Sequence, residues 1–317
     1  MKKTDRREFI ISGAAAVAVA TLSNSTALAA AEPKRKMTMD LICGRLGVKA
    51  NQEQAIDFAA QHGFESVGPN AGELAKLSSA QLQEMKGRLK EKGLVFSAAG
   101  MPVDFRGGEE KFKTGLAALP AEAAVLQKAG VTRVGTWLKP YSDDLTYLQN
   151  FRQHGIRLRE VGKILADHGL RFGLEYVGPK TLWASKKYAF VHSMAETKDL
   201  LSEINVPSVG FVLDSWHWYT AHENKDDLLS LSNEQIVAVD LNDAPKGLEI
   251  DAQIDNQREL PATTGVIDVA TFLRALNQLG YDGPVRAEPF NAPLRKLPAQ
   301  QAVAKTAAAM KKAFAMI

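Results

Sequence analysis

The chain repeats one pattern, in which a helical segment ends at a glycine and a short apolar run follows at once. Five junctions of this kind occur, at Gly63, Gly93, Gly130, Gly169 and Gly280. Glycine adopts the left-handed conformation at a helix C-terminus with little strain, so each glycine is predicted to end a helix and lead into a strand. Helices that alternate with strands in this way predict a parallel sheet.

Eight apolar runs are predicted to be strands. They cover residues 37–43, 66–69, 95–99, 133–136, 172–175, 210–214, 237–241 and 285–288. Eight parallel strands close a sheet into a barrel, and the 288 residues after position 29 come close to the ~250 that such barrels typically need. No G-x-G-x-x-G motif follows an early strand, which disfavours a doubly wound sheet. The sequence therefore predicts one α/β domain over residues 37–317, a single (β/α)8 TIM barrel, with a last helix at 299–314 on its outside or base.

The N-terminus carries paired arginines, Arg6 and Arg7, before Phe9 and a weakly apolar, alanine-rich run. Small residues follow, and 27–29 fit an A-x-A cleavage site. This segment is similar to a twin-arginine export signal. An ordinary secretory signal and an uncleaved anchor are the alternatives. Residues 1–29 are therefore predicted to be an export signal peptide that directs the protein to the periplasm, with no stable membrane span after processing.

Charge and cysteine content limit the kinds of ligand and metal site that this chain can have. The formal net charge is +3, and the first 29 residues contribute +2 of it. A nearly neutral body lacks the basic excess of a nucleic-acid binder, so a small polar ligand is expected and nucleic acid is not. Cys43 is the only cysteine, which excludes a disulfide within one chain and a cysteine metal cluster. Whether identical chains assemble into an oligomer is left open.

Four acidic residues stand at the downstream ends of predicted strands: Glu175, Asp214, Asp240 and Glu288. In a parallel barrel these strand ends meet at one mouth, where barrel enzymes place their chemistry. Carboxylates that face one another repel unless a cation neutralises them. The four residues are therefore predicted to form a metal site. For any one of them the alternative is a helix N-cap, because aspartate at a strand end often precedes a helix.

Several segments resemble the sugar phosphate isomerase/epimerase family of xylose-isomerase-like TIM barrels, over nearly the whole mature chain. They are Gly173-Leu174-Glu175, Leu213-Asp214-Ser215-Trp216-His217, Val239-Asp240-Leu241-Asn242-Asp243 and Ala287-Glu288-Pro289. The resemblance implies a divalent cation held by Glu175, Asp214, Asp240 and Glu288, with Asp240 where the family has histidine. An all-oxygen set favours Mn²⁺ or Mg²⁺, with Co²⁺ and Zn²⁺ as alternatives. Asp243 or Asn242 turning inward in place of Asp240 is the alternative, and strand alternation puts Asp240 and Asn242 on the same side.

Other residues are expected to contact a substrate. His217 lies three residues after Asp214, and the D-x-x-H resemblance favours a substrate-binding or ligand-supporting role over simple packing. Arg258 lies in a loop similar to the family's arginine-bearing loop and is expected to bind the substrate through its planar fork. A salt bridge to Asp255 or Glu259 is the alternative.

Aromatic side chains near the predicted strand ends favour a carbohydrate or polyol ligand. Trp137 and Trp216 are predicted to bind it, although core packing is equally available to each. The set comprises Trp137, Trp183, Trp216, Trp218 and Phe290.

The resemblance implies a divalent-metal-dependent isomerase or epimerase for a small-molecule sugar or polyol. Glu175 and Glu288 would act as base and acid, exchanging a proton next to a carbonyl through a metal-bound enediolate. Expulsion of a β-substituent would instead give a lyase or dehydratase acting on a keto-sugar, keto-glycoside or inosose. A non-catalytic sugar-binding barrel is the third alternative.

Overall fold

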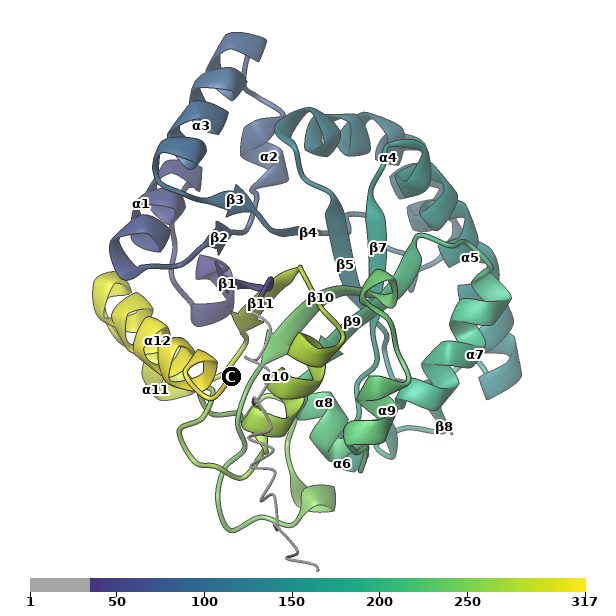
Figure 1. The fold of residues 1–317 in the computed structure, drawn as a ribbon. Coiled ribbons are helices and arrows are strands. Elements are labelled where there is room, and N and C mark those ends of the chain that lie inside the picture. The colour runs from purple at the N-terminus through teal and green to yellow at the C-terminus, as the bar shows by residue number, and fades with distance from the viewer. Residues whose placement is uncertain (1–34) are drawn as a thin grey trace, which may run out of the picture. The chain divides into compact units, whose positions relative to one another are not determined.

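The computed structural model describes residues 35–317. The predicted signal peptide at 1–29 therefore lies outside the described residues. Within them, parallel strands run through the centre and helices surround them, as Figure 1 shows. The helices between the strands and the parallel pairing confirm the predicted TIM barrel.

The central sheet has nine strands in the order β3-β2-β1-β11-β10-β9-β7-β5-β4. Their bounds are β1 Thr38–Leu41, β2 Ser66–Val67, β3 Val95–Phe96, β4 Ala98–Gly100, β5 Arg133–Trp137, β7 Arg171–Glu175, β9 Val209–Asp214, β10 Ile236–Leu241 and β11 Pro284–Ala287. Ser97 separates β3 from β4, so the two segments occupy the one predicted strand at 95–99; β3 pairs with β2, and β4 pairs with β5. All eight predicted strands are thus present, the third of them broken.

Helices connect these strands. They are α1 Gln52–His62, α2 Ala71–Leu74, α3 Ser79–Glu91, α4 Glu109–Ala129, α5 Tyr147–Asp167, α6 Lys180–Trp183, α7 Met194–Ile204, α8 Ser215–Thr220, α9 Lys225–Leu229, α10 Val269–Gln278, α11 Ala292–Arg295 and α12 Ala299–Phe314, with short 3-10 helices η1 Cys43–Leu46, η2 Asn233–Gln235 and η3 Ile250–Ala252. The five predicted cap glycines all have positive φ, between 66° and 85°, which confirms the repeat. Helix α12 has the predicted bounds and packs on α1 and α10.

One small element was not predicted. β6 (Tyr141–Ser142) and β8 (Tyr188–Ala189) form an antiparallel pair between the loops that follow β5 and β7. Strands of two residues carry no alternation to read, so the sequence gives no sign of them. Among residues 35–317, no helix combines the length and apolarity needed to cross a bilayer.

Four neighbouring strands bring ionisable residues to one level of the barrel. In the strand register Asp40 of β1 lies beside Arg286 of β11, Arg286 beside Asp240 of β10, and Asp240 beside Asp214 of β9. All four side chains are buried. Small apolar residues form a separate buried cluster, comprising Ala98, Val212 and Ala238. The barrel therefore contains a layer of buried charged side chains at the level of these register positions.

Gly210 keeps β9 close to the chain before β10. A Cβ at this position would lie 2.2 Å from the carbonyl oxygen of Gln235, far inside van der Waals contact. We expect Gly210→Ala to lower the free energy of unfolding by about 1–3 kcal/mol, because backbone has to move to admit the methyl group. Urea denaturation measures it. Gly100→Ala in β4 is the matched control, since nothing lies within 4 Å of its Cβ; equal losses in both variants would contradict this reading.

Candidate active site

A cavity of about 370 Å³ opens at the C-terminal ends of β5, β7 and β11. Its walls carry five predicted site residues from different parts of the chain: Trp137, Glu175, His217, Arg258 and Glu288. The remaining lining residues are Arg45, Tyr141, Val177, Leu182, Asp255 and Phe290. The fold thus gathers most of the predicted residues around one opening.

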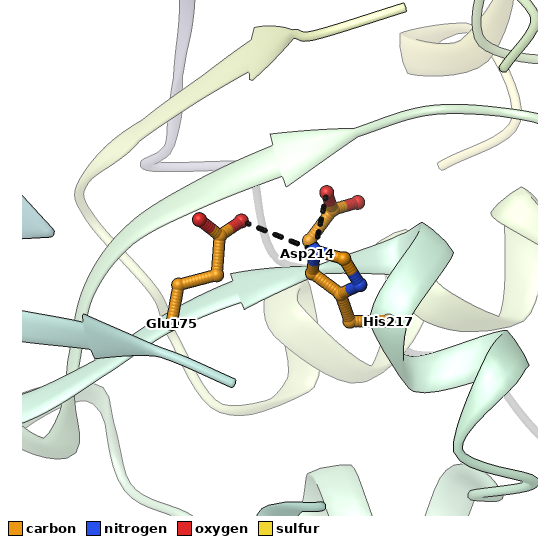
Figure 2. Close-up of side chains that lie close together, drawn as sticks. All are labelled: Glu175, Asp214 and His217. Atoms are coloured by element: carbon orange, nitrogen blue, oxygen red, sulfur yellow. Dashed lines mark ion pairs between the residues drawn. The ribbon is translucent and has the colours of Figure 1, made fainter. Parts of the chain in front are cut away.

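Glu175, Asp214 and His217 form a compact group (Figure 2). Glu175 ends β7, Asp214 ends β9, and His217 lies in α8, which begins directly after Asp214. His217 Nε2 is 3.8 Å from a carboxylate oxygen of each acid. Asp214 is also the N-cap of α8, since its Oδ1 accepts from the Trp216 amide at 2.8 Å. The capping alternative and the clustering at the mouth therefore both hold for Asp214.

A second group of possible ligands shares Glu175 with the first. Glu175, Asp240 and Glu288 each offer a carboxylate oxygen within 4.8 Å of the others, as do the ligand atoms of Glu175, Asp214 and His217. All of these residues are buried. The described residues thus contain an acidic cluster whose geometry suits a divalent cation.

Burial shapes the electrostatics of these carboxylates. It raises the pKa of Glu175 well above its usual range, and the neighbouring charges of Asp240 and Asp214 raise it further. Burial also raises the pKa of Asp214 to about 6, against the opposing effect of Arg258. For Asp240, burial is outweighed by Arg286 and Arg45, so its pKa lies below the usual value. The same buried cluster therefore contains carboxylates whose pKa values are raised and one whose pKa is lowered.

Arg258 connects several acids at the cavity. Its Nη1 donates to Asp214 Oδ2 at 2.6 Å and to Glu288 Oε2 at 3.3 Å. Its Nη2 donates to Asp255 Oδ1 at 2.8 Å. The alternative salt bridge to Asp255 is therefore present, and the guanidinium also lines the cavity where a substrate would lie. Glu259 instead accepts a hydrogen bond from Asn291.

Two further arginines at this mouth were missed from the sequence. Arg286 donates from Nε to Asp240 Oδ1 at 2.6 Å and from Nη2 to Oδ2 at 3.0 Å. Arg45, in η1, forms an ion pair with Glu288. A sequence signal existed for Arg286, because it lies two residues before Glu288 and strand alternation puts both on the same face.

Asn242 and Asp243 separate as alternation predicts. Asn242 is buried inside the mouth, where its Nδ2 donates to Asp214 Oδ1 at 2.9 Å and its Oδ1 accepts from the Glu288 amide at 3.0 Å. Asp243 turns to the following loop and accepts from the backbone amides of residues 264–267. Asp243 therefore orders the loop that follows β10, and Asn242 orients the acids.

The surroundings of His217 in the mouth favour the neutral form of its imidazole. Burial lowers its pKa well below the usual value, and the charge of Arg258 lowers it further. The Gly178 amide donates to its Nδ1 at 3.2 Å, and Nε2 points toward Glu175 and Asp214. A neutral ring held from behind by a backbone amide is suited to a polar contact with a bound molecule. Its predicted role in substrate binding stays a prediction.

The two tryptophans predicted to bind substrate lie in different surroundings. Trp137 is 46% exposed and lines the cavity. Trp216 is fully buried, and the Arg258 guanidinium lies 5.4 Å from the centre of its ring. Trp216 is not among the residues that line the cavity, so its position suits packing under Arg258. Its contact with substrate stays a prediction.

A larger cavity of about 830 Å³ adjoins the first at the ends of β1, β2 and β4. Arg45 lines both, and Arg286 lines the larger one. Amide side chains of Asn51 and Asn70 are part of its wall. The mouth thus extends beyond the acidic cluster.

Comparison with known proteins identifies relatives of this architecture. A family model described as a xylose isomerase-like TIM barrel matches residues 56–313. An inosose isomerase of Bacillus subtilis is 28% identical over 146 residues, which are 46% of this chain and 49% of the relative. A 3-dehydroshikimate dehydratase of Pseudomonas putida is 27% identical over 145 residues, 45% of this chain and 21% of the relative. The chain thus spans about half the length, or less, of these curated relatives.

Solved structures share the fold over most of the chain. A xylose isomerase domain protein from Alicyclobacillus acidocaldarius superposes with a TM-score of 0.74 and 30% identity, over 86% of this chain and 96% of that protein. The IOLI protein with a bound zinc atom superposes with a TM-score of 0.71 over 87% of this chain and 96% of that protein. Its identity is 20%, so this second likeness concerns the fold.

A hydrogen-bonded pair next to Glu175 in sequence, the buried Tyr176 and the half-buried Glu223, is sensitive to pH. Tyr176 donates to Glu223, which also accepts from the Met194 amide at 2.6 Å. Burial raises the pKa of Glu223 to about 7 from an ordinary 4.5. The folded state therefore binds this proton more tightly than the unfolded state, and stability should fall as pH rises from about 4.5 to 7, by about 1–3 kcal/mol.

Glu223→Gln should remove that part of the pH dependence, because the amide keeps hydrogen bonds to both partners and does not titrate. Urea denaturation at pH 4.5 and pH 7.5 measures the difference for each protein. Glu91→Gln, on the exposed end of α3, serves as the control. An unchanged pH dependence in Glu223→Gln would show that other groups cause it.

Proposed function

Because the chain belongs to the xylose isomerase-like TIM barrel family, we propose that it is a divalent-metal-dependent enzyme that moves a proton on the carbon beside a carbonyl. The substrate class is a sugar or polyol, and the reaction is isomerisation or epimerisation. The inosose isomerase named among its relatives acts in this class by its name, which supports the proposal.

One observation carries the proposal: two buried glutamates, Glu175 and Glu288, line the same cavity from different strands. Glu175 ends β7, and Glu288 follows β11. Each offers a carboxylate oxygen within 4.8 Å of the other. A pair of carboxylates facing one small cavity can take a proton from one position of a bound carbon skeleton and return it to another.

The residues at the mouth fit a divalent cation. Glu175 Oε1 is buried and has no hydrogen-bond partner among the described residues, a costly state that a bound cation would relieve. The predicted ligands Glu175, Asp214, Asp240 and Glu288 are all buried at this mouth, and the finer choice of Mn²⁺ or Mg²⁺ rests on their oxygen atoms. The cation would supply Lewis acidity toward a carbonyl oxygen.

The chain's own side chains then bind and orient the substrate. Arg258 presents its guanidinium to the cavity and is suited to a hydroxyl or carboxylate group. Trp137 is half-exposed and lines the cavity, so its ring would contact sugar C–H groups. His217 faces the reacting region from α8 as a neutral polar group. Binding, orientation and proton transfer are thus assigned to separate groups.

A lyase or dehydratase is the second candidate, and the larger cavity favours it. The cavity of about 830 Å³ shares Arg45 with the cavity at the acidic cluster and would give room to a substituent of a bound ring. A keto-glycoside has such a substituent and can lose it from the carbon next to the deprotonated position. A relative named 3-dehydroshikimate dehydratase supports elimination chemistry on this fold.

We also propose export to the periplasm by the twin-arginine route, on the strength of Arg6 and Arg7 and the alanine-rich run after them. This route carries folded proteins, so a metal centre would be filled before export. Phosphorylated sugars are scarce outside the cytoplasm, which favours an unphosphorylated substrate.

Proton transfer is tested by solvent exchange. The purified protein, with its metal content determined, is incubated in D₂O with a panel of keto-sugars and inososes, and deuterium at carbon is followed by mass spectrometry. Glu288→Gln should slow exchange by about 10²- to 10⁴-fold, because an amide cannot accept the proton. Glu91→Gln, the same substitution at an exposed site outside the cavity, is the control. The metal content of Glu288→Gln distinguishes loss of the base from loss of the cation.

The products discriminate the candidates. Exchange with the substrate mass otherwise retained supports an isomerase or epimerase, and loss of water or of an aglycone supports a lyase. Absence of exchange with every compound that binds would favour a sugar-binding barrel. Full turnover by Glu288→Gln would exclude Glu288 as acid or base.

Export is tested with the twin-arginine pair. Arg6→Lys with Arg7→Lys should leave the full-length protein in the cytoplasm, because the twin-arginine receptor reads the guanidinium pair. Cell fractionation and immunoblotting measure the distribution. Lys2→Arg with Lys3→Arg is the control with unchanged charge; equal periplasmic amounts in all three proteins would contradict this route.

A further inference from the structure

Asp240 is already fully engaged by a side chain of the same barrel. Arg286 approaches it with two parallel bonds, Nε to Oδ1 at 2.6 Å and Nη2 to Oδ2 at 3.0 Å. Asp240 is 0% exposed and Arg286 is 4% exposed. A bidentate guanidinium–carboxylate pair of this kind is among the strongest charge-assisted contacts in proteins.

The pair is also fixed in place. Arg286 lies on β11 between two aspartates in the register, Asp240 on β10 and Asp40 on β1. Asp40 is buried as well, with Oδ1 accepting from Ser66 at 3.0 Å. The Arg286 guanidinium thus sits among strand-borne groups inside the barrel. Arg258 comes instead from the loop after β10, donates to Asp214 through Nη1 alone, and lines the smaller cavity.

Removal of Asp240 from this pair would be costly. An arginine that is buried without its partner loses solvation and Coulombic attraction together, which makes breaking such a pair strongly destabilising. A cation that recruited Asp240 would have to break the bidentate contact and would bring its own charge close to that guanidinium. Cation binding to Asp240 is therefore disfavoured both by the loss of the bidentate contact and by repulsion from the Arg286 guanidinium.

We propose that Arg286 withdraws Asp240 from the metal ligands, so that a divalent cation at this mouth is held by Glu175, Asp214 and Glu288 without it. The proposal rests on the proposed metal-dependent function. It gives Arg286 a positioning role: the guanidinium supplies a fixed positive charge on the β10–β11 side, where the family resemblance implies a histidine ligand.

The test compares Mn²⁺ binding by three proteins, measured by isothermal titration calorimetry and by electron paramagnetic resonance of free Mn²⁺. The first is the unaltered chain. The second, Asp240→Leu with Arg286→Met, removes the pair and keeps the local charge. The third, Arg286→Met, removes only the arginine and sets Asp240 free as a fourth carboxylate ligand.

The paired variant should bind Mn²⁺ within about threefold of the unaltered chain, because neither lost group is a ligand. Arg286→Met should bind it tenfold or more tightly than the paired variant, and Mn²⁺ should raise its melting temperature most. A tenfold or greater loss of affinity in the paired variant, a change of the size that ligand-sphere mutations produce, would overturn the proposal. An Arg286→Met protein that binds no more tightly than the paired variant would also overturn it.

These outcomes distinguish a failure of the proposed metal-dependent function from a failure of the role proposed for Arg286. If the unaltered chain binds no Mn²⁺, Mg²⁺ or Zn²⁺, the metal-dependent function fails. The comparison of Arg286→Met with the paired variant still decides whether Arg286 is what withholds Asp240. If Arg286→Met does not fold, the paired variant alone decides, because it removes one negative and one positive group together and Asp40 keeps its hydrogen bond from Ser66.

Discussion

The buried carboxylates at the barrel mouth coexist because positive groups on neighbouring elements compensate them. Arg286 binds Asp240, Arg258 binds Asp214, and Arg45 pairs with Glu288. Without these contacts, adjacent strands could not place acids at the same level of a closed barrel, since each unpaired charge would cost several kcal/mol in the interior. Among the described residues Glu175 has no arginine ion pair of this kind, and its Oε1 has no hydrogen-bond partner, so charge compensation is incomplete at this carboxylate. The proposed cation belongs there.

Much of the fold could be predicted because its signals are local. Gly63 and Gly130 end helices through a backbone conformation that glycine tolerates, and an apolar run follows each of them. The break at Ser97 and the short β6–β8 pair could not be foreseen. Both depend on how distant segments meet, and neither changes the hydrophobic pattern of the chain.

The acidic residues of the site could be predicted from the sequence, whereas Arg286 and Arg45 were not predicted. Strand ends mark Glu175 and Asp214 directly, because the carboxyl ends of parallel strands share one mouth. Arg286 was overlooked although alternation places it beside Glu288, because its partner Asp240 is 46 residues away in sequence and only the β10–β11 register joins them. Arg45 lies in a 3-10 helix after β1, where no periodicity points to the cavity. Reading the inward positions of each strand as pairs, across neighbouring strands, would have exposed the first of these two.

The outcome of the proposed reaction depends on what surrounds the reacting carbon as much as on the acids. In that reaction, a proton taken by Glu175 or Glu288 would leave an electron pair on carbon, which can take up a proton again or expel a neighbouring group. Expulsion requires room for the leaving group, and the cavity beyond Arg45 provides it on the β1–β4 side. Return of the proton to the opposite face, as in epimerisation, would use a second carboxylate near the same carbon, and Glu175 and Glu288 lie close enough together to serve as that pair. Arg45 lines both spaces and pairs with Glu288, so it can neutralise a departing oxygen and hold the acid at once. The balance between isomerase and lyase therefore turns on whether a substrate carries a substituent that reaches past this arginine.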